Sequence, residues 1–261
     1  MTSPTHNGSP DARRLYLELL KKSLTNTLFA AEPDTDRDQK KYVHDFIRHY
    51  IKGSAISMLP QARMDNLQQC VVDVLQRNIP GDLIETGVWR GGATIFMRGV
   101  LKAYSVTDRR VWVADSFQGL PEPDAARFPT EAKYHATPLM KTLYGKFAVG
   151  VDEVKRNFEA YGLLDEQVRF LVGWFKDTLP SAPIKKLAVM RLDGDYYDST
   201  MDSLTALYDK LSPGGYVIID DYGEDVWTNC RQATEDFRQQ WNITTPLVRV
   251  DSKCYFWQRE Q

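Results

Sequence analysis

Acidic side chains close four of the strand-like segments in this chain, and they are its clearest candidates for chemistry. Glu85 ends the first segment and Asp115 the second, while Asp193 ends the fourth and the pair Asp220-Asp221 ends the fifth. The carboxyl ends of parallel strands meet at one edge of a sheet, where neighbouring strands lie about 4.8 Å apart. We therefore expect Asp193, Asp220 and Asp221 to converge.

Three carboxylates in one place repel one another unless a cation neutralises them. Oxygen ligands without a nearby His or Cys favour Mg²⁺ or another hard divalent cation. The sequence thus predicts a metal site formed by Asp193, Asp220 and Asp221. The alternative is that aspartates at strand ends cap helices. That role fits Asp195 and Asp198, which stand just before a predicted helix, but it does not explain the other three.

A glycine-rich loop follows Glu85 and opens into a predicted helix over residues 93–104. Its spacing is G-x-x-x-G-G, from Gly87 to Gly91 and Gly92. Glycine lets backbone approach a ligand closely, and the N-terminus of a helix attracts its polar end. The loop is neither a G-x-G-x-x-G motif nor a P-loop. An ordinary strand-to-helix turn is the alternative, but Asp115 stands where such folds hold a ribose, so a nucleoside-type cofactor site is indicated.

A metal beside a nucleoside cofactor suits one kind of reaction. The metal orients a substrate hydroxyl and lowers its pKa, and a carboxylate then takes the proton. Asp193 is the best candidate for that base, because its strand is expected next to the first one. The oxygen then attacks an electrophilic carbon of the cofactor, so that catalysis depends mostly on positioning.

The elements that must position these residues alternate between strands and helices. Strands are predicted at residues 82–85, 110–115, 168–172, 187–193, 216–220, 247–250 and 254–258, with a turn at 213–215, and helices at 93–104, 152–161, 199–211 and 230–241. Only Asp251, Ser252 and Lys253 separate the last two strands, so these form an antiparallel hairpin. The pattern predicts a doubly wound α/β domain.

The chain divides into three parts by composition and pattern. Residues 1–11 are polar, and we expect them to form a disordered tail. Residues 12–80 are predicted to form a helical cap or lid. Residues 81–261 are predicted to form the Rossmann-like domain, with a substrate-facing insert at about 118–150. The cap carries predicted helices at 13–31, 42–51 and 64–78 and a loop at 53–60. The cap has two possible roles, which are to close over the substrate and to form a dimer.

Composition excludes several classes of protein. With a net charge of −2 in 261 residues, nothing indicates nucleic-acid binding. No apolar run approaches the length of a membrane span, and the N-terminus lacks the apolar core of a signal peptide. Three widely spaced cysteines argue against a disulfide framework or a zinc site. We expect a cytoplasmic protein that binds neither nucleic acid nor membrane.

Five sequence segments resemble the macrocin O-methyltransferase family. They are residues 85–92, 111–117, 173–180, 193–195 and 218–222, and the resemblance extends over roughly 15–259. It implies a class I S-adenosylmethionine-dependent methyltransferase fold, with a seven-stranded sheet and an antiparallel last strand. It also implies Mg²⁺ dependence, a homodimer, and a small-molecule acceptor, a sugar hydroxyl on a macrolide or aminocoumarin antibiotic.

The resemblance carries roles onto individual residues. The glycine loop is expected to hold the methionine part of S-adenosylmethionine, Asp115 and Ser116 its ribose, and the segment from Gly173 to Phe175 its adenine. The cofactor residues so implied are Glu85, Thr86, Gly87, Val88, Arg90, Gly91, Asp115, Ser116, Gly173, Trp174 and Phe175. Asp193, Asp220 and Asp221 are the implied Mg²⁺ ligands, and Asp193 is also the implied base.

Two segments depart from the family pattern, residues 57–64 and 121–150, and both correspond to substrate-facing parts. The leading expectation is methylation of a sugar hydroxyl of a glycosylated natural product. A catechol or other phenol is the alternative acceptor, since it also chelates Mg²⁺. A catalytically silent S-adenosylmethionine-binding scaffold is the alternative of another class. A nicotinamide oxidoreductase is excluded by the missing glycine motif.

Overall fold

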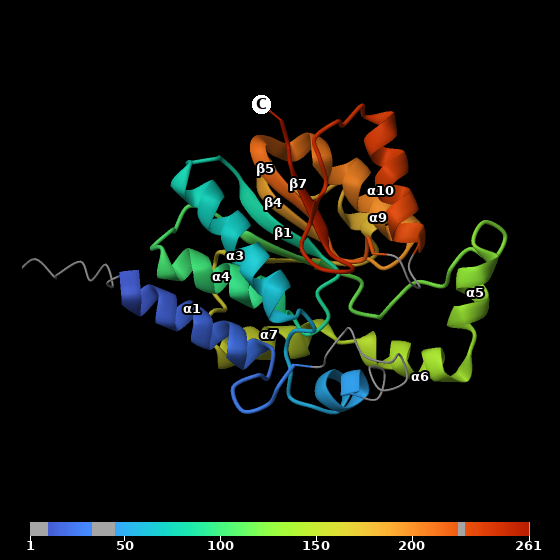
Figure 1. The fold of residues 1–261 in the computed structure, drawn as a ribbon, viewed down its shortest axis with the longest axis horizontal. Helices are drawn as coiled ribbons and strands as arrows, with labels where there is room; N and C mark the ends of the chain where they lie inside the picture. The colour runs from blue at the N-terminus through green and yellow to red at the C-terminus, as the bar shows by residue number, and fades with distance from the viewer. Residues whose placement is uncertain (1–9, 33–44, 224–227, 261) are drawn as a thin grey trace, which may run out of the picture.

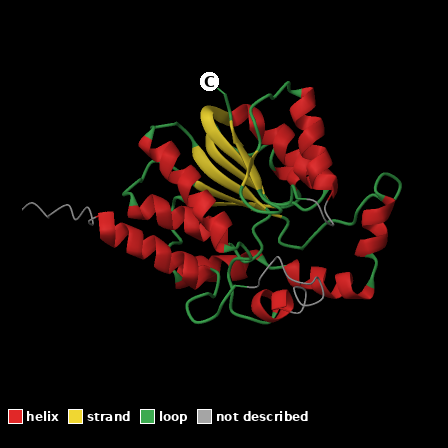
Figure 2. Cartoon of the chain, viewed as in Figure 1, coloured by secondary structure: helices red, strands yellow, loops and turns green. Residues whose placement is uncertain are grey.

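The computed structural model describes residues 10–32, 45–223 and 228–260, and its centre is one seven-stranded sheet (Figures 1 and 2). The strand order is β3-β2-β1-β4-β5-β7-β6. The first five strands are parallel, and β7 runs antiparallel to β5 and β6. The strands are β1 (Asp82–Thr86), β2 (Val111–Asp115), β3 (Val168–Val172), β4 (Leu187–Leu192), β5 (Leu211–Ile219), β6 (Val248–Arg249) and β7 (Tyr255–Gln258). This confirms the predicted α/β fold and its antiparallel last strand.

Helices cover both faces of the sheet, so its strands are buried on both sides and read as apolar runs. The helices on one side are α1 (Pro10–Leu24), α3 (Gln61–Gln76), α4 (Gly92–Ala103) and α7 (Val151–Ala160), of which α1 packs on α3 and α4. Those on the other side are α8 (Phe175–Thr178), α9 (Tyr197–Leu207) and α10 (Thr228–Gln240). Successive strand residues point to opposite faces. Leu83 and Val113 therefore join one core, and Ile84 and Trp112 the other.

Three further helical segments lie outside these two layers. They are the π-helix η1 (Ile47–Ile51) from the predicted cap, and α5 (Pro129–His135) and α6 (Pro138–Phe147) from the predicted insert. The side chain of Thr137 accepts a hydrogen bond from the N–H of Met140, and Pro138 occupies the first turn of α6. No helix in the described ranges is long and apolar enough to cross a membrane.

The N-terminal helix differs from the prediction at both ends. Pro10 and Asp11, predicted as part of the tail, begin α1, and residues 1–9 lie outside the described ranges. The helix ends at Leu24 rather than at residue 31. The carbonyl of Leu24 accepts hydrogen bonds from the backbone of Ile56 and Ser57, and Asn26 has a positive φ of 57°. Of the predicted helix at 42–51, residues 42–44 lie outside the description and the rest is helical.

The predicted turn at residues 213–215 lies inside β5, which begins at Leu211. Residues near the C-terminus supply the pairing that the local sequence does not show. The N–H of Gly214 donates to the carbonyl of Arg259, and the N–H of Arg259 donates to the carbonyl of Gly215. Helix α9 ends at Leu207 and is followed directly by the 3₁₀-helix η2 (Tyr208–Lys210), so helical structure extends nearly to the predicted end at residue 211.

Candidate active site

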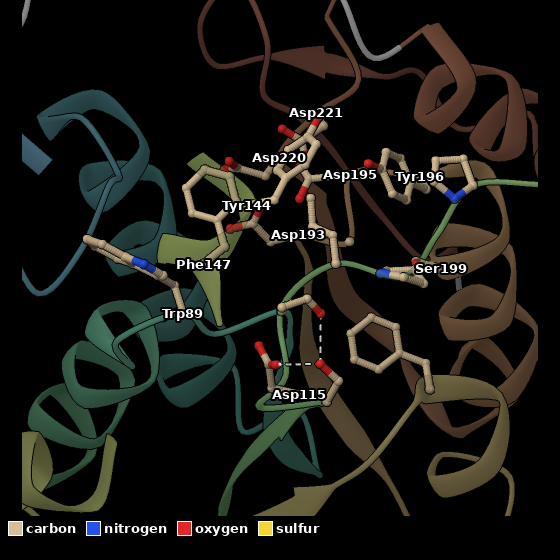
Figure 3. A pocket seen from close by; sticks show the side chains of 18 of the residues that line it. Trp89, Asp115, Tyr144, Phe147, Asp193, Asp195, Tyr196, Ser199, Asp220 and Asp221 are labelled. Atoms are coloured by element: carbon tan, nitrogen blue, oxygen red, sulfur yellow. Dashed lines mark hydrogen bonds between the residues drawn. The ribbon is translucent and has the colours of Figure 1, made fainter. Parts of the chain in front are cut away.

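A cavity of about 950 Å³ opens where β1, β2, β4 and β5 end, and elements from all parts of the chain line it. The loops after these strands form its floor, while η1, α5 and α6 contribute side chains to its walls. This position is the one expected for a ligand site in an open parallel sheet. Figure 3 shows the carboxylates of Asp193, Asp195, Asp220 and Asp221 close together, with Trp89 and Phe147 on one side, Tyr196 and Ser199 on the other, and Asp115 apart below them.

The structure brings Asp193, Asp220 and Asp221 together, as predicted. One carboxylate oxygen from each lies within 4.8 Å of the others. Burial is the main cause that raises the pKa of Asp193, followed by the charge of Asp220. Burial, followed by the charges of Asp195 and Asp193, raises the pKa of Asp221 well above its usual range, and its Oδ2 is buried without a partner among the described residues. A buried carboxylate in that condition requires a proton or a cation.

Asp195 is a fourth acid in this group, and its predicted role as a helix cap is wrong. The N-cap position of α9 is Tyr196, with no side-chain hydrogen bond to the helix. Asp195 instead lines the cavity, and burial together with Asp193 and Asp220 raises its pKa well above the usual range. Asp198 is not the N-cap either, because it lies inside the first turn of α9, where its side chain forms an ion pair with Arg127 at 2.7 Å.

Arg191 supplies much of the counter-charge from below the cavity. It stands within the apolar strand β4 and is only 1% exposed. One guanidinium nitrogen donates to Glu85 and, at 2.9 Å, to Oδ2 of Asp193, and the other donates to Oδ1 of Asp220 at 2.5 Å. Arg191 therefore fixes the orientation of two of the three clustered carboxylates.

Arg63 reaches the same cluster from α3, within the predicted cap. Its Nη1 donates to Oδ2 of Asp220 and its Nε to Oδ2 of Asp251, both at 2.6 Å. Each oxygen of Asp220 is thus paired with a different arginine. Asp251 lies between β6 and β7, so one side chain ties three distant segments of the chain together.

Replacing Arg63 by alanine should destabilise the fold. It would leave a buried oxygen of Asp220 without its cation, and losing one partner of a largely buried ion pair costs about 2–4 kcal/mol in free energy of unfolding. Chemical denaturation in the presence of a chelator measures this loss. Arg14→Ala, which breaks an exposed pair with Asp11, is the control and should leave stability unchanged. An Arg63→Ala protein as stable as the wild type would show that the pair makes no net contribution.

The glycine loop and the acidic cluster share a wall of the cavity. Gly87 has a φ of +87°, and a Cβ at that position would lie 1.8 Å from the backbone oxygen of Asp193. Only glycine permits this contact. Asp115 stands on the other side of the loop, where its carboxylate accepts hydrogen bonds from the N–H groups of Val88 at 2.8 Å and Phe117 at 2.7 Å. The acid is thereby fixed at the cavity surface.

The predicted cofactor residues separate into two groups. Five line the cavity: Gly87, Asp115, Ser116, Trp174 and Phe175. In the described structure the other six lie behind its wall: Glu85, Thr86, Val88, Arg90, Gly91 and Gly173. Glu85 is buried against Arg191, and burial raises its pKa to about 8. Arg90 donates to backbone carbonyls of the predicted cap, including that of Ala55 at 2.8 Å. Direct cofactor contact by these six stays a prediction.

The cap and the insert add an apolar side to the cavity. Phe46, Tyr50, Met58 and Leu59 come from the cap, and Met140, Leu143, Tyr144 and Phe147 from α6. Several charged residues that the sequence analysis did not assign to the site lie at it, and those that touch or approach the acidic cluster include Arg63, Glu131, Arg191 and Asp195. Only Arg191, a charge inside an apolar strand, and Asp195, in the segment Asp193-Gly194-Asp195, carried a signal in the sequence.

Comparison with known proteins gives consistent matches over nearly the whole chain. The family model described as Macrocin-O-methyltransferase (TylF) matches residues 51–259. The 8-demethyl-8-(2,3-dimethoxy-alpha-L-rhamnosyl)-tetracenomycin-C 4'-O-methyltransferase of Streptomyces olivaceus is 49% identical, over 95% of this chain and 93% of the relative. The demethyldecarbamoylnovobiocin O-methyltransferase of Streptomyces niveus is 46% identical, over 94% and 93%. The solved structure of the O-methyltransferase NovP superimposes with a TM-score of 0.82 at 45% identity, over 95% of this chain and all of that one.

Proposed function

Because this chain belongs to the macrocin O-methyltransferase family, we propose that it methylates a sugar hydroxyl of a glycosylated secondary metabolite with the aid of a divalent cation. The enzyme class itself is established by the family: the chain is an O-methyltransferase with the fold of class I S-adenosylmethionine-dependent enzymes. The acceptor, the cation and the roles of individual residues are the proposal.

The observation that carries the proposal is the contact between Gly87 and Asp193. It places the loop expected to hold the cofactor directly against the expected base. The side chains at the site fit both S-adenosylmethionine and a divalent cation. Asp221 offers a buried oxygen that has no partner within the described ranges, beside two further carboxylates, as a hard cation requires. Asp115 presents a fixed carboxylate at the end of β2, where a ribose is held in such folds.

When bound, S-adenosylmethionine supplies an electrophilic methyl group, and Mg²⁺ lowers the pKa of the acceptor hydroxyl. The chain itself provides position and proton transfer. Asp193 takes the proton of the acceptor hydroxyl, and Arg191 holds its carboxylate in place at 2.9 Å. Asp115 accepts hydrogen bonds from ribose hydroxyls. Trp89 and Phe147 close the apolar side of the cavity (Figure 3) and exclude water from the acceptor.

The names of the relatives favour a sugar as acceptor. The relative from Streptomyces olivaceus is named for methylation at the 4' position of a rhamnosyl tetracenomycin derivative. A catechol or other phenol remains the alternative acceptor, because it offers the same pair of oxygens to a cation. A silent scaffold is not retained, because the family consists of methyltransferases and Asp193, Asp220 and Asp221 are all present.

Methyl transfer from labelled S-adenosylmethionine to a panel of acceptors tests the proposal. The panel contains rhamnosyl tetracenomycin derivatives, demethyldecarbamoylnovobiocin and simple catechols. We expect transfer to a glycoside. Transfer to catechols alone would overturn the sugar acceptor while leaving the enzyme class intact.

Residues 12–80 are proposed as a lid that also serves a homodimer. The lid is supported by Phe46, Tyr50 and Met58, which line the cavity from this part of the chain. The dimer is supported by apolar side chains exposed on α1, Leu15 and Leu19. Sedimentation of the purified protein distinguishes a dimer from a monomer.

Asp115→Ala should weaken the binding of S-adenosylmethionine. Hydrogen bonds to a charged group contribute enough that their loss should raise the dissociation constant about 10–100-fold. Calorimetric titration without acceptor measures this directly, and Asp198→Ala at the edge of the same cavity is the control with unchanged affinity. An unchanged dissociation constant for Asp115→Ala would remove Asp115 from the ribose role.

A further inference from the structure

Helix α5, in the insert, contributes Glu131 to the lining of the cavity and places His135 beside Tyr196. Glu131 and His135 are four residues apart and therefore share one face of the helix. Glu131 lines the cavity although it is only 8% exposed. Neither residue belongs to a motif that the family resemblance covers, and neither has a part in the mechanism above.

The carboxyl group of Glu131 is only partly satisfied. Asn229, at the start of α10, donates a hydrogen bond to it, and burial raises its pKa to about 7. Its Oε1 is buried and has no hydrogen-bond partner within the ranges that the structure describes. A buried oxygen without a partner is costly, so a hydroxyl donor that reached this atom would relieve that cost.

The position of Glu131 is fixed by contacts of the same helix. His135 Nδ1 lies 2.8 Å from the hydroxyl of Tyr196, which follows the acidic segment after β4. Burial lowers the pKa of His135, so the ring is neutral at physiological pH. The negative charge of Glu131 in turn raises the pKa of Asp195. These contacts hold helix α5 beside the clustered acids after β4, so that Glu131 lies close to Asp195.

Neither metal binding nor the catalytic proton transfer explains why Glu131 lines the cavity. The carboxylates whose oxygens cluster within 4.8 Å are Asp193, Asp220 and Asp221, and Glu131 is outside that cluster. The predicted cofactor loop lies against Asp193, and no contact of Glu131 with it is seen among the described residues. The remaining occupant of the cavity is the methyl acceptor. In its ionised form the Glu131 carboxylate accepts hydrogen bonds and donates none, so that form binds a free hydroxyl and rejects a methoxy group at the same place.

We propose that Glu131 binds a free hydroxyl of the acceptor sugar next to the one that is methylated, and so selects acceptors that are not yet methylated there. This inference rests on the sugar acceptor of the proposed function. It makes Glu131 a specificity residue contributed by a segment in which the chain departs from the family pattern.

Two glycosides that differ only at the neighbouring positions test the inference. They are 8-demethyl-8-(2,3-dimethoxy-α-L-rhamnosyl)-tetracenomycin C and its counterpart with free hydroxyls at positions 2 and 3. The wild type should favour the free-hydroxyl compound by about 10–100-fold in kcat/KM, because a buried hydrogen-bonding site rejects an analogue that lacks the donor. Glu131→Ala should reduce this preference to within about threefold, mainly through KM.

Two further variants distinguish a loss of acceptor recognition from a loss of folding. Glu131→Gln keeps an accepting oxygen of the same shape and should retain part of the preference. Glu122→Ala removes an exposed glutamate from the same cavity and should retain all of it. As a readout without turnover, Glu131→Ala should weaken calorimetric binding of the free-hydroxyl compound, in the presence of S-adenosylhomocysteine, by about tenfold.

A Glu131→Ala enzyme with the preference of the wild type would overturn the inference and leave the proposed function standing. The same holds for a wild type that does not discriminate between the two compounds. If the wild type methylates neither glycoside, the sugar acceptor is wrong, and the role of Glu131 fails with it.

Discussion

Replacing Asp193 by alanine should reduce methyl transfer by at least about 1,000-fold, because it removes both a base and a metal ligand. Binding of S-adenosylmethionine should remain close to that of the wild type. Asp193 touches the predicted cofactor loop through its backbone oxygen, which the substitution keeps, rather than through its carboxylate. Single-turnover rates and calorimetric titration of the cofactor measure the two effects separately.

The control for this experiment is Asp198→Ala, which removes an exposed aspartate at the edge of the same cavity. It should keep most of the activity. An Asp193→Ala enzyme with near-normal rates would contradict both the base and the metal assignment. Loss of cofactor binding together with activity would instead mean that the substitution disturbs the loop around Gly87.

Replacing Asp221 by asparagine should have opposite effects on stability and activity. Oδ2 of Asp221 is buried and has no partner in the part of the chain that the structure describes, and its neighbours are acids. Removing the charge should therefore stabilise the protein in chelator by about 1 kcal/mol or more. At a fixed low Mg²⁺ concentration the same change should reduce activity at least about 100-fold, because a hard cation loses a charged ligand.

Thermal denaturation with and without Mg²⁺ reports the first effect, and the Mg²⁺ concentration for half-maximal rate reports the second. The wild type should gain stability from Mg²⁺ and the Asp221→Asn protein much less. If both proteins respond equally to Mg²⁺, or if neither does, Asp221 is not a metal ligand.

The sheet and the meeting point of the acids were predictable from the sequence. Parallel strands buried on both faces appear as short apolar runs, such as residues 187–192, and the acids at their ends necessarily share one edge. The convergence of Asp193, Asp220 and Asp221 follows from strand order alone. Local patterns and one rule of topology were sufficient.

The charges that surround these acids depend on long-range contacts. Arg63 meets Asp220 across 157 positions of sequence, and no local pattern indicates that pairing. Glu131 reaches the cavity only because the insert folds into two short helices that pack beside α10 and the loop after β4. Residues 213–215 were predicted as a turn for the same reason, since their partner is Arg259 near the other end of the chain.

Product analysis with carbon-13-labelled S-adenosylmethionine tests the central claim most directly. A rhamnosyl tetracenomycin glycoside is incubated with the enzyme in Mg²⁺ and, separately, in chelator, and the labelled methyl group is located by NMR. The proposed mechanism predicts a labelled methoxy group on the sugar in Mg²⁺ and none in chelator. A label on the aglycone, or equal transfer in chelator, would contradict it.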